Sequence, residues 1–330
     1  MLESMLKNRP KGKPALLSPS VLLQYLCLLS IGANERHQQL FFHALGVETL
    51  DECIDLLRCK GHLYPTFMYL WSREALTTDV VDDMRNMGLE VSWDEAPNEV
   101  VDIWLRDHTD MLVNGYNVLV QEPFPTSCLL SAISVGIKWH HAFSRDRFDH
   151  MDFNVGGKTK IVPCMHGHQN VPSLQVEHGF LIALSCADQQ GMIVFGIPRD
   201  HDPGNVLLEM VLPDTFARLL RQPRKVTNVR LPTVQTWCRT PSVPELLQES
   251  LFEGIVDRPM FEHLHPDFCA DVVHHCVYLE WNERGQRFLQ DEQPYSEEME
   301  FVSVNKSFAV ALVQQDQLVC AGIVEDPSYQ

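Results

Sequence analysis

The sequence has few basic residues and no long apolar run. Its 330 residues include 26 Lys and Arg against 44 Asp and Glu, which gives a formal net charge of −18. Nucleic-acid binding depends on a basic surface, so this balance argues against a general nucleic-acid partner. No apolar run reaches the roughly 20 residues that a membrane-spanning helix needs. We therefore expect neither a nucleic-acid nor a membrane partner.

The short motifs of several enzyme classes are also missing. The sequence contains no Gly-x-Ser-x-Gly, no Gly-rich phosphate loop and no His-Glu-x-x-His. Its ten cysteines are scattered singly, without a Cys-x-x-Cys pair, which favours reduced, buried thiols over a disulfide framework. We expect a protein that is not an enzyme and needs no cofactor.

One pattern of soft ligands offers a minor alternative. Cys164, His166 and His168 alternate along one stretch, so a strand there would present all three on one face. Zinc sites use these residue types, but a fourth ligand at a telling spacing is missing. Metal binding is therefore the weakest of the functions considered, and we expect no metal site.

The N-terminal region permits two interpretations. Four basic residues between Lys7 and Lys13 precede the apolar run Val21 to Ile31, which mimics a secretion signal. Ser18-Pro19-Ser20 interrupts that pattern, and Ser20 is better explained as the cap of a buried helix over Val21 to Ile31. We expect a cytoplasmic protein, with secretion as the alternative.

Apolar periodicity predicts one mixed α+β domain over residues 1–330, with helices early and strands late. The helices expected after the first core helix are 36–45, 50–59, 78–87, 98–108, 214–220 and 243–252. The strands expected are 63–71, 89–93, 118–121, 128–137, 148–155, 160–165, 180–185, 192–197 and 226–237.

The stretch from Asp271 to Val324 holds the feature that most needs explanation. A buried strand over Val272 to Trp281 is followed by Asn282-Glu283-Arg284-Gly285, where Gly285 can take a turn that other residues resist. Residues 286–300 are strongly acidic, and β structure resumes at Phe301 and closes in a hairpin over 308–324. The sequence thus predicts an acidic loop between two buried β segments.

This chain resembles the serpin family over nearly its whole length. Val272-Val273-His274-His275 and then Asn282-Glu283-Arg284-Gly285 are similar to the serpin pattern Val-Val-His-Lys and then Asn-Glu-Glu-Gly. Other matches follow in serpin order: Ser18-Pro19 with Gly32-Ala33, Trp104 with Thr109, Lys138-Trp139 with Phe143, Val162-Pro163-Cys164-Met165, Leu231-Pro232, and Phe308 with Gly322. A short first helix and a nearly absent fourth helix make the chain most similar to the compact serpins of poxviruses.

The resemblance implies the serpin fold, in which several helices pack on three β-sheets and a reactive-centre loop is exposed. A serpin inhibits by suicide: a protease cleaves the loop, and the freed segment inserts as an extra strand in the main sheet. On this resemblance the reactive loop is 286–300 and the hinge before it contains Glu283 and Gly285. The loop residues singled out are Gln286, Phe288, Glu292, Ser296, Glu297, Glu298, Met299 and Glu300.

The hinge departs from the inhibitory pattern. Inhibitory serpins have Thr and then mostly Ala after the hinge glycine, whereas this chain has Gln286, Arg287 and Phe288. Phe288 and Glu292 would share the interior face of an inserted strand. Over-packing there costs about 1–3 kcal/mol, and an unpaired buried Glu292 would add to it. The loop is also about three residues short, which removes roughly 10 Å of reach.

The positions that open the main sheet are altered too. The resemblance puts Ser18, Ser131 and His274 at the shutter, the region in the middle of the sheet, with Ser131 in place of Asn and Val21 in place of a second serine. It puts Trp139 at the breach, where the loop enters the sheet. Thr233 stands where a Lys partner for Glu283 is expected.

Three hypotheses follow. The first is a serpin that has lost suicide inhibition and, as a monomer, binds a protein partner through the acidic loop. The second is a working serine or cysteine protease inhibitor, possibly viral and directed at host proteases, whose scissile bond would lie within Ser296 to Glu300. The third is the metal-binding protein that uses Cys164, His166 and His168.

Overall fold

The structure is a computed structural model that describes residues 3, 5–6, 12–59, 64–93, 97–108, 126–143, 149–187, 191–200, 202–240, 261–266, 268, 272–287, 300–315 and 317–328. The predicted segments 118–121 and 243–252 lie outside these residues. Seven helices have described bounds: α2 (Pro19–Gly32), α3 (Glu35–Leu45), α4 (Leu50–Cys59), α5 (Thr78–Asn86), α6 (Pro97–His108), α7 (Pro203–Met210) and α8 (Pro213–Leu220).

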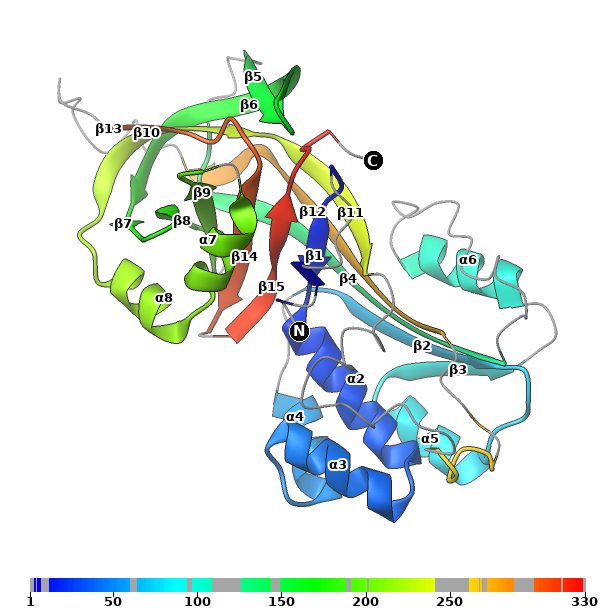
Figure 1. Ribbon diagram of the computed structural model, residues 1–330. Coiled ribbons are helices and arrows are strands. Elements are labelled where there is room, and N and C mark those ends of the chain that lie inside the picture. Colours follow the sequence, from blue (N-terminus) through cyan, green and yellow to red (C-terminus); the bar gives the residue numbers. More distant parts are fainter. Residues whose placement is uncertain are drawn as a thin grey trace.

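Three β-sheets form the framework (Figure 1). The five-stranded sheet has the order β11 (Val234–Thr240), β12 (Val272–Arg287), β4 (Ser127–His141), β2 (Thr66–Ser72) and β3 (Leu89–Trp93). The six-stranded sheet has the order β1 (Ala15–Leu17), β15 (Gln317–Val324), β14 (Phe308–Gln314), β9 (Met192–Pro198), β8 (Gly179–Ser185) and β7 (Ser173–Gln175). The four-stranded sheet has the order β13 (Glu300–Ser303), β10 (Lys225–Pro232), β6 (Lys158–Val171) and β5 (Asp149–Val155).

The helix α2 forms the centre of the helical half of the molecule. Twelve of its residues are buried, as an almost entirely apolar sequence requires. It contacts α3, α4 and α5 and reaches the sheets at β15 and β4. Figure 1 shows these four helices grouped at one end, with α7 and α8 beside the six-stranded sheet. Within the described residues, no helix is long and apolar enough to cross a membrane.

The α+β prediction is confirmed, with corrections at single elements. Ser18, not Ser20, caps α2, because the Val21 N–H donates to Ser18 Oγ. The sequence prediction lacks the strand β1, which has only three residues, and the helix α7. The Asp202 cap and the proline that follows it are the signal that could have predicted α7. Gly285 does not end its strand, because β12 continues to Arg287.

Candidate functional site: the seam between β4 and β12

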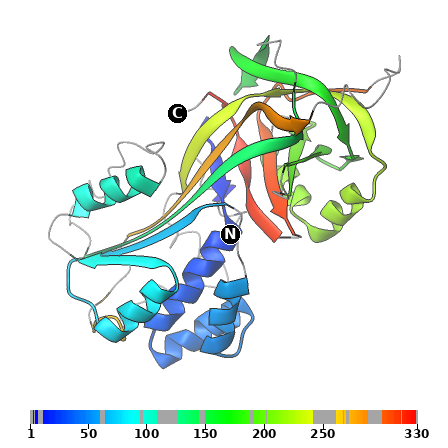
Figure 2. The same ribbon diagram turned by 180° about the vertical axis from the view of Figure 1, so that it is seen from behind.

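The site predicted for sheet opening is the seam where β4 and β12 lie side by side. Figure 2 shows the two long strands running together across the molecule. They pair in parallel without interruption from Val272 opposite Cys128 to Trp281 opposite Ile137. Pairing then shifts and resumes with Gly285 opposite Trp139 and Arg287 opposite His141. A strand inserted here would have to separate every one of these pairs.

The middle of the seam is joined by a buried histidine, His275. It is fully buried and lies opposite Ser131 in the β4–β12 register. Its Nδ1 is 2.9 Å from Ser131 Oγ, and its Nε2 accepts a hydrogen bond of 3.0 Å from the Ser18 N–H. Ser18 Oγ donates in turn to the carbonyl of Val319 on β15. One side chain thus connects β12 with β4 and with the start of α2.

These contacts correct the sequence prediction by one position. His274 was assigned to the shutter, but His275 is the histidine that meets Ser18 and Ser131. Successive residues of a strand point to opposite faces, so His274 faces away from this network. The substitution of Ser131 for Asn does not remove the polar connection, because the Ser131 hydroxyl reaches the imidazole. The sequence has two adjacent histidines, and the register that sets His275 opposite Ser131 shows which of them meets the network.

Burial lowers the pKa of His275 from its ordinary 6.5 to about 3. The imidazole is out of contact with water, and its charged form loses hydration. The geometry agrees with this direction. Nε2 must stay unprotonated to accept from Ser18, so the proton of the neutral ring sits on Nδ1 and is donated to Ser131. His275 is therefore a neutral connector at physiological pH.

The end of the seam beyond Ile137 is built around Trp139, the predicted breach residue. Trp139 is fully buried and packs edge-on against Phe143 and Trp281, with ring centroids 5.5 and 6.4 Å away. Its indole N–H donates a 2.6 Å hydrogen bond to the carbonyl of Asn282 on β12. Because an indole has one donor and no acceptor, this bond fixes the ring against the neighbouring strand.

A local bulge in β12 occupies this end of the seam. From Trp281 to Gly285 the strand β12 advances four residues, while β4 advances only two, from Ile137 to Trp139. The extra residues are held at three points. The Trp139 indole binds the Asn282 carbonyl, the Phe143 N–H binds the Glu283 carbonyl at 3.1 Å, and Asn282 Oδ1 accepts from the Arg284 N–H. Thr233 stands where a Lys partner for Glu283 is expected. Its hydroxyl instead donates a hydrogen bond to the Pro163 carbonyl.

Most of the predicted reactive loop lies outside the described residues. This applies to Phe288, Glu292, Ser296, Glu297, Glu298 and Met299, and for Gln286 and Arg287 only the backbone is described. The far end of the loop returns at Glu300, where β13 pairs in parallel with β10. Glu300 forms an exposed ion pair of 2.8 Å with Lys225 on β10. The loop therefore starts at the end of the seam and finishes on the four-stranded sheet.

The three candidate metal ligands do not come together. Cys164 is buried against the Arg230 guanidinium, whose Nε lies 3.4 Å from its sulfur, and Arg230 also pairs with Asp149 at 2.9 Å. Burial raises the pKa of the Cys164 thiol despite this neighbouring cation. Within the described part of the chain, no three His, Cys, Asp or Glu side chains are grouped as metal ligands.

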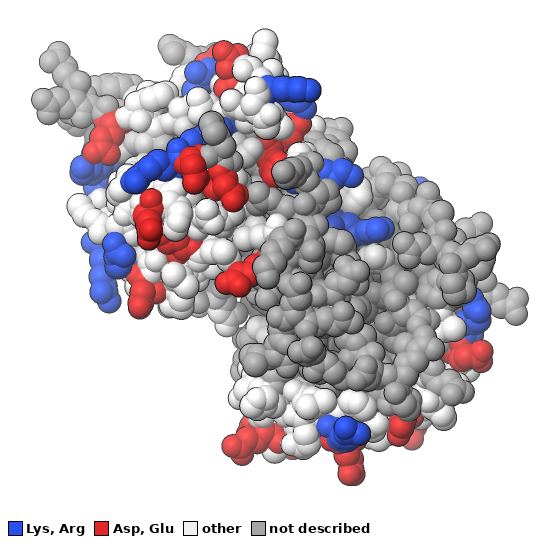
Figure 3. Space-filling model, in the orientation of Figure 1, with Lys and Arg blue, Asp and Glu red and all other residues white. Residues whose placement is uncertain are grey.

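On the face seen in Figure 3, the described acidic side chains are interspersed with Lys and Arg.

Comparison with known proteins identifies the family. The family model described as Serpin (serine protease inhibitor) matches residues 89–327. Two solved structures are similar over nearly the full length. One is native protease nexin-1 with heparin (TM-score 0.82, 14% identity, 98% of this chain and 95% of that chain); the other is SRPN18 from Anopheles gambiae (TM-score 0.83, 16% identity, 99% and 97%).

No curated protein matches the sequence. The two structures, at these low identities, support the fold. The family model covers more than half of the chain, and its matched region contains the β4–β12 seam. The chain therefore belongs to the serpin family.

Proposed function

We propose that this serpin binds a protein partner through the segment 286–300 and does not act as a suicide inhibitor. The observation that carries this proposal is the path of β12. The strand passes Gly285 without ending and stays paired with β4 as far as Arg287. A loop that inserts between β4 and β12 has to reverse direction after the hinge, because it must run antiparallel to the strand it has just left. Here Gly285 and Arg287 instead pair with β4 in the parallel direction.

The bulge adds a second obstacle. The carbonyls of Asn282 and Glu283 and the side chain of Asn282 are all engaged in hydrogen bonds. Separating the seam at this end breaks the first two, and each typically contributes about 0.5–1.5 kcal/mol. These groups must find new partners before the first loop residue can enter.

The side chains after Gly285 oppose insertion as well. Gln286, Phe288 and Glu292 are placed by strand alternation on one face of an inserted strand. Burying Phe288 between packed strands costs about 1–3 kcal/mol, and burying a Glu292 carboxylate without a partner costs more. The sequence of the segment 286–300 instead carries Glu297 and Glu298 near its end, and this negative charge suits a basic protein partner.

The decisive experiment cuts the loop within 286–300 with a nonspecific protease and compares the melting temperature before and after. Insertion stabilises the sheet, so a working inhibitor gains roughly tens of degrees on cutting. We expect an unchanged melting temperature for this protein, with the cut position established by mass spectrometry. A large rise would contradict the proposal.

A matched variant tests whether the hinge is the cause. Gln286→Thr, Arg287→Ala and Phe288→Ala together give the small residues of an inhibitory hinge and leave the remaining loop intact. A gain in stability on cutting in this variant, and not in the natural protein, would show that the side chains of residues 286–288 are the obstacle. If neither gains, the bulge or the loop length is the obstacle.

A second function is favoured by one observation, the intact network of His275, Ser131 and Ser18. The resemblance to serpins puts these residues where the sheet opens, and their contacts support an active inhibitor of serine or cysteine proteases. A covalent complex with a protease that survives denaturing electrophoresis would establish this alternative. The poxvirus-like subtype, the cytoplasmic location and the monomeric state remain predictions from the sequence.

A further inference from the structure

The helical half of the molecule contains a pair of cysteine thiols in direct contact. Cys27 lies on α2 and Cys53 on α4, and they belong to one small apolar cluster with Phe42. The Cys27 thiol is hydrogen-bonded to the sulfur of Cys53. Both side chains are buried, at 2% and 0% exposure. The two thiols therefore lie in one contact cluster across the packing of α2 on α4, and the Ser30 hydroxyl contacts both residues.

The surroundings of the pair favour a thiolate on Cys53. The Ser30 hydroxyl lies 3.7 Å from Cys53 Sγ and 2.7 Å from the Cys27 carbonyl, so it completes a three-residue polar cluster. The hydrogen bond from Cys27 is the main cause that lowers the pKa of Cys53, from its ordinary 9 to about 7, against the opposing effect of burial. The thiolate is the reactive form of cysteine.

The other described cysteines with a shifted pKa behave in the opposite way. Burial raises the pKa of Cys186 and Cys320 to about 12, and it also raises the pKa of Cys128, Cys164 and Cys238. Cysteines that respond reversibly to oxidants combine a low thiol pKa, a second thiol and solvent access; this pair has the first two features and is buried.

We propose that Cys27 and Cys53 form a reversible disulfide between α2 and α4 when the protein meets a hydroperoxide. The Cys53 thiolate attacks one peroxide oxygen, the O–O bond breaks, and hydrogen peroxide leaves a sulfenic acid on Cys53 and a hydroxide ion. Cys27 sulfur then attacks the Cys53 sulfur, the S–O bond breaks, and water leaves with the Cys27 proton. Two electrons pass from the two sulfurs to the peroxide, and a thiol reductant reverses the change.

Burial sets the conditions for this reaction. Hydrogen peroxide is close to water in size, and it would reach the pair through a local opening of the small cluster that contains Cys27, Cys53 and Phe42. No other thiol has to become exposed for this reaction to occur. The disulfide would tie α4 to the same helix whose Ser18 contacts His275 at the seam, so oxidation would restrain α2 at both its start and its middle.

The test treats the purified protein with a small excess of hydrogen peroxide and maps its peptides by mass spectrometry without reduction. We expect a cross-linked peptide pair joining Cys27 and Cys53, a loss of two thiols and a melting temperature higher by about 5 °C. Dithiothreitol should reverse all three changes. Cys53→Ser should abolish the cross-link, and Cys27→Ser should leave Cys53 to oxidise to the sulfinic acid.

Cys320→Ser provides the matched control, because it removes a thiol that is equally buried but has a raised pKa. The Cys27–Cys53 cross-link should form in this variant at the rate seen in the natural protein. Oxidation of Cys186 or Cys320 while Cys27 and Cys53 stay reduced would overturn the proposal. So would sulfinic acid on Cys53 in the natural protein without any cross-link.

Discussion

His275 shows how much of the seam depends on one uncharged side chain. It accepts from the backbone of Ser18 and donates to Ser131, so both of its nitrogens are used in the neutral state. A lysine or arginine could not replace it, because neither can accept a hydrogen bond. The polar connection across the seam therefore depends on an imidazole that stays unprotonated.

This arrangement predicts a specific pH dependence of stability. The pKa of His275 is about 3 in the folded protein against an ordinary 6.5, so between these values only the unfolded chain binds the proton. Stability from this residue is therefore lost as the pH falls below about 6.5. The loss between pH 7 and pH 5 should be about 2 kcal/mol.

Urea unfolding of the natural protein and of His275→Gln at both pH values measures this difference. Glutamine can donate and accept but does not titrate in this range, so the variant should lose less stability on acidification. Equal losses in the two proteins would show that His275 is not the group responsible.

At the scale of elements, a single carboxylate of the five-stranded sheet binds two side chains of helix α6. Glu90 on β3 accepts from the Trp104 indole N–H at 2.9 Å, and its other oxygen lies 2.9 Å from His108 Nε2. Trp104 also stacks on Tyr69 of β2, with ring centroids 5.1 Å apart. One residue of β3 thus meets two successive turns of α6.

We expect Glu90→Ala to loosen α6 without unfolding the protein. The loss in global stability should be about 1 kcal/mol or less, because Glu90 is half exposed and exposed ion pairs contribute little. Amide hydrogen exchange in α6 should accelerate much more than exchange in β4 or β12. Asp107→Ala, which removes an exposed carboxylate from the same helix, is the control. Equal acceleration in both variants would contradict this role of Glu90.

The elements also show what the sequence could predict. Strands such as β14 and β15 were found because their apolar runs are separated by a polar turn, and α3 because Gly46 follows it with a left-handed backbone. The bulge at Asn282–Arg284 could not be found in this way. It depends on hydrogen bonds from Trp139 and Phe143, which are more than 130 residues away in the chain.

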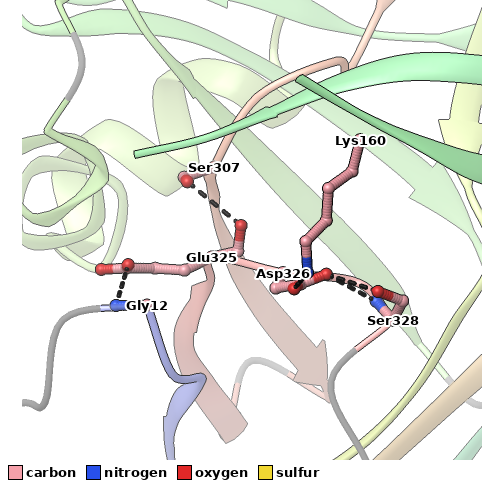
Figure 4. Close-up of polar contacts among 6 residues, drawn as sticks. All are labelled: Gly12, Lys160, Ser307, Glu325, Asp326 and Ser328. Carbon is pink, nitrogen blue, oxygen red and sulfur yellow. Dashed lines mark hydrogen bonds and ion pairs between the residues drawn. The ribbon is translucent and has the colours of Figure 1, made fainter. Parts of the chain in front are cut away.

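At the scale of the whole molecule, a cluster near the C-terminal end joins four distant parts of the chain (Figure 4). Glu325 accepts from the Gly12 N–H at 2.6 Å, and its carbonyl accepts from Ser307. Asp326 binds Lys160 of β6 and the backbone and hydroxyl of Ser328. Asp326 is only 6% exposed. The cluster fastens the six-stranded sheet to the β5–β6 hairpin.

Asp326 should contribute to stability through its charge. Burial raises the pKa of its carboxyl, but hydrogen bonds from Lys160 and Ser328 outweigh this and hold it below the ordinary 3.8. Its contribution is therefore present above pH 3.8 and is lost as the pH falls through the lower folded value. We expect Asp326→Asn to cost about 1–3 kcal/mol at pH 7, measured by urea unfolding.

Substitution of Lys160, the ion-pair partner of Asp326, separates the contribution of the ion pair from that of the Ser328 hydrogen bonds. Lys160→Met should account for part of the Asp326→Asn loss, and the double variant should lose less than the sum of the two. Lys158→Met, on the same strand, is the control and should be close to neutral. Full additivity of the Lys160 and Asp326 losses would mean that the two side chains do not interact in solution.

The pairing of β1 with β15 has a consequence for how this protein is made. Ala15 lies opposite Ile323 and Leu17 opposite Ala321, so these partners are about 300 residues apart in the chain. During synthesis, β1 and the apolar α2 that follows it must wait until β15 has left the ribosome before β1 can pair in its sheet. Contacts of such long range form slowly, and partly made chains expose apolar surface meanwhile. The nascent chain should therefore depend on chaperones far more than the finished protein does.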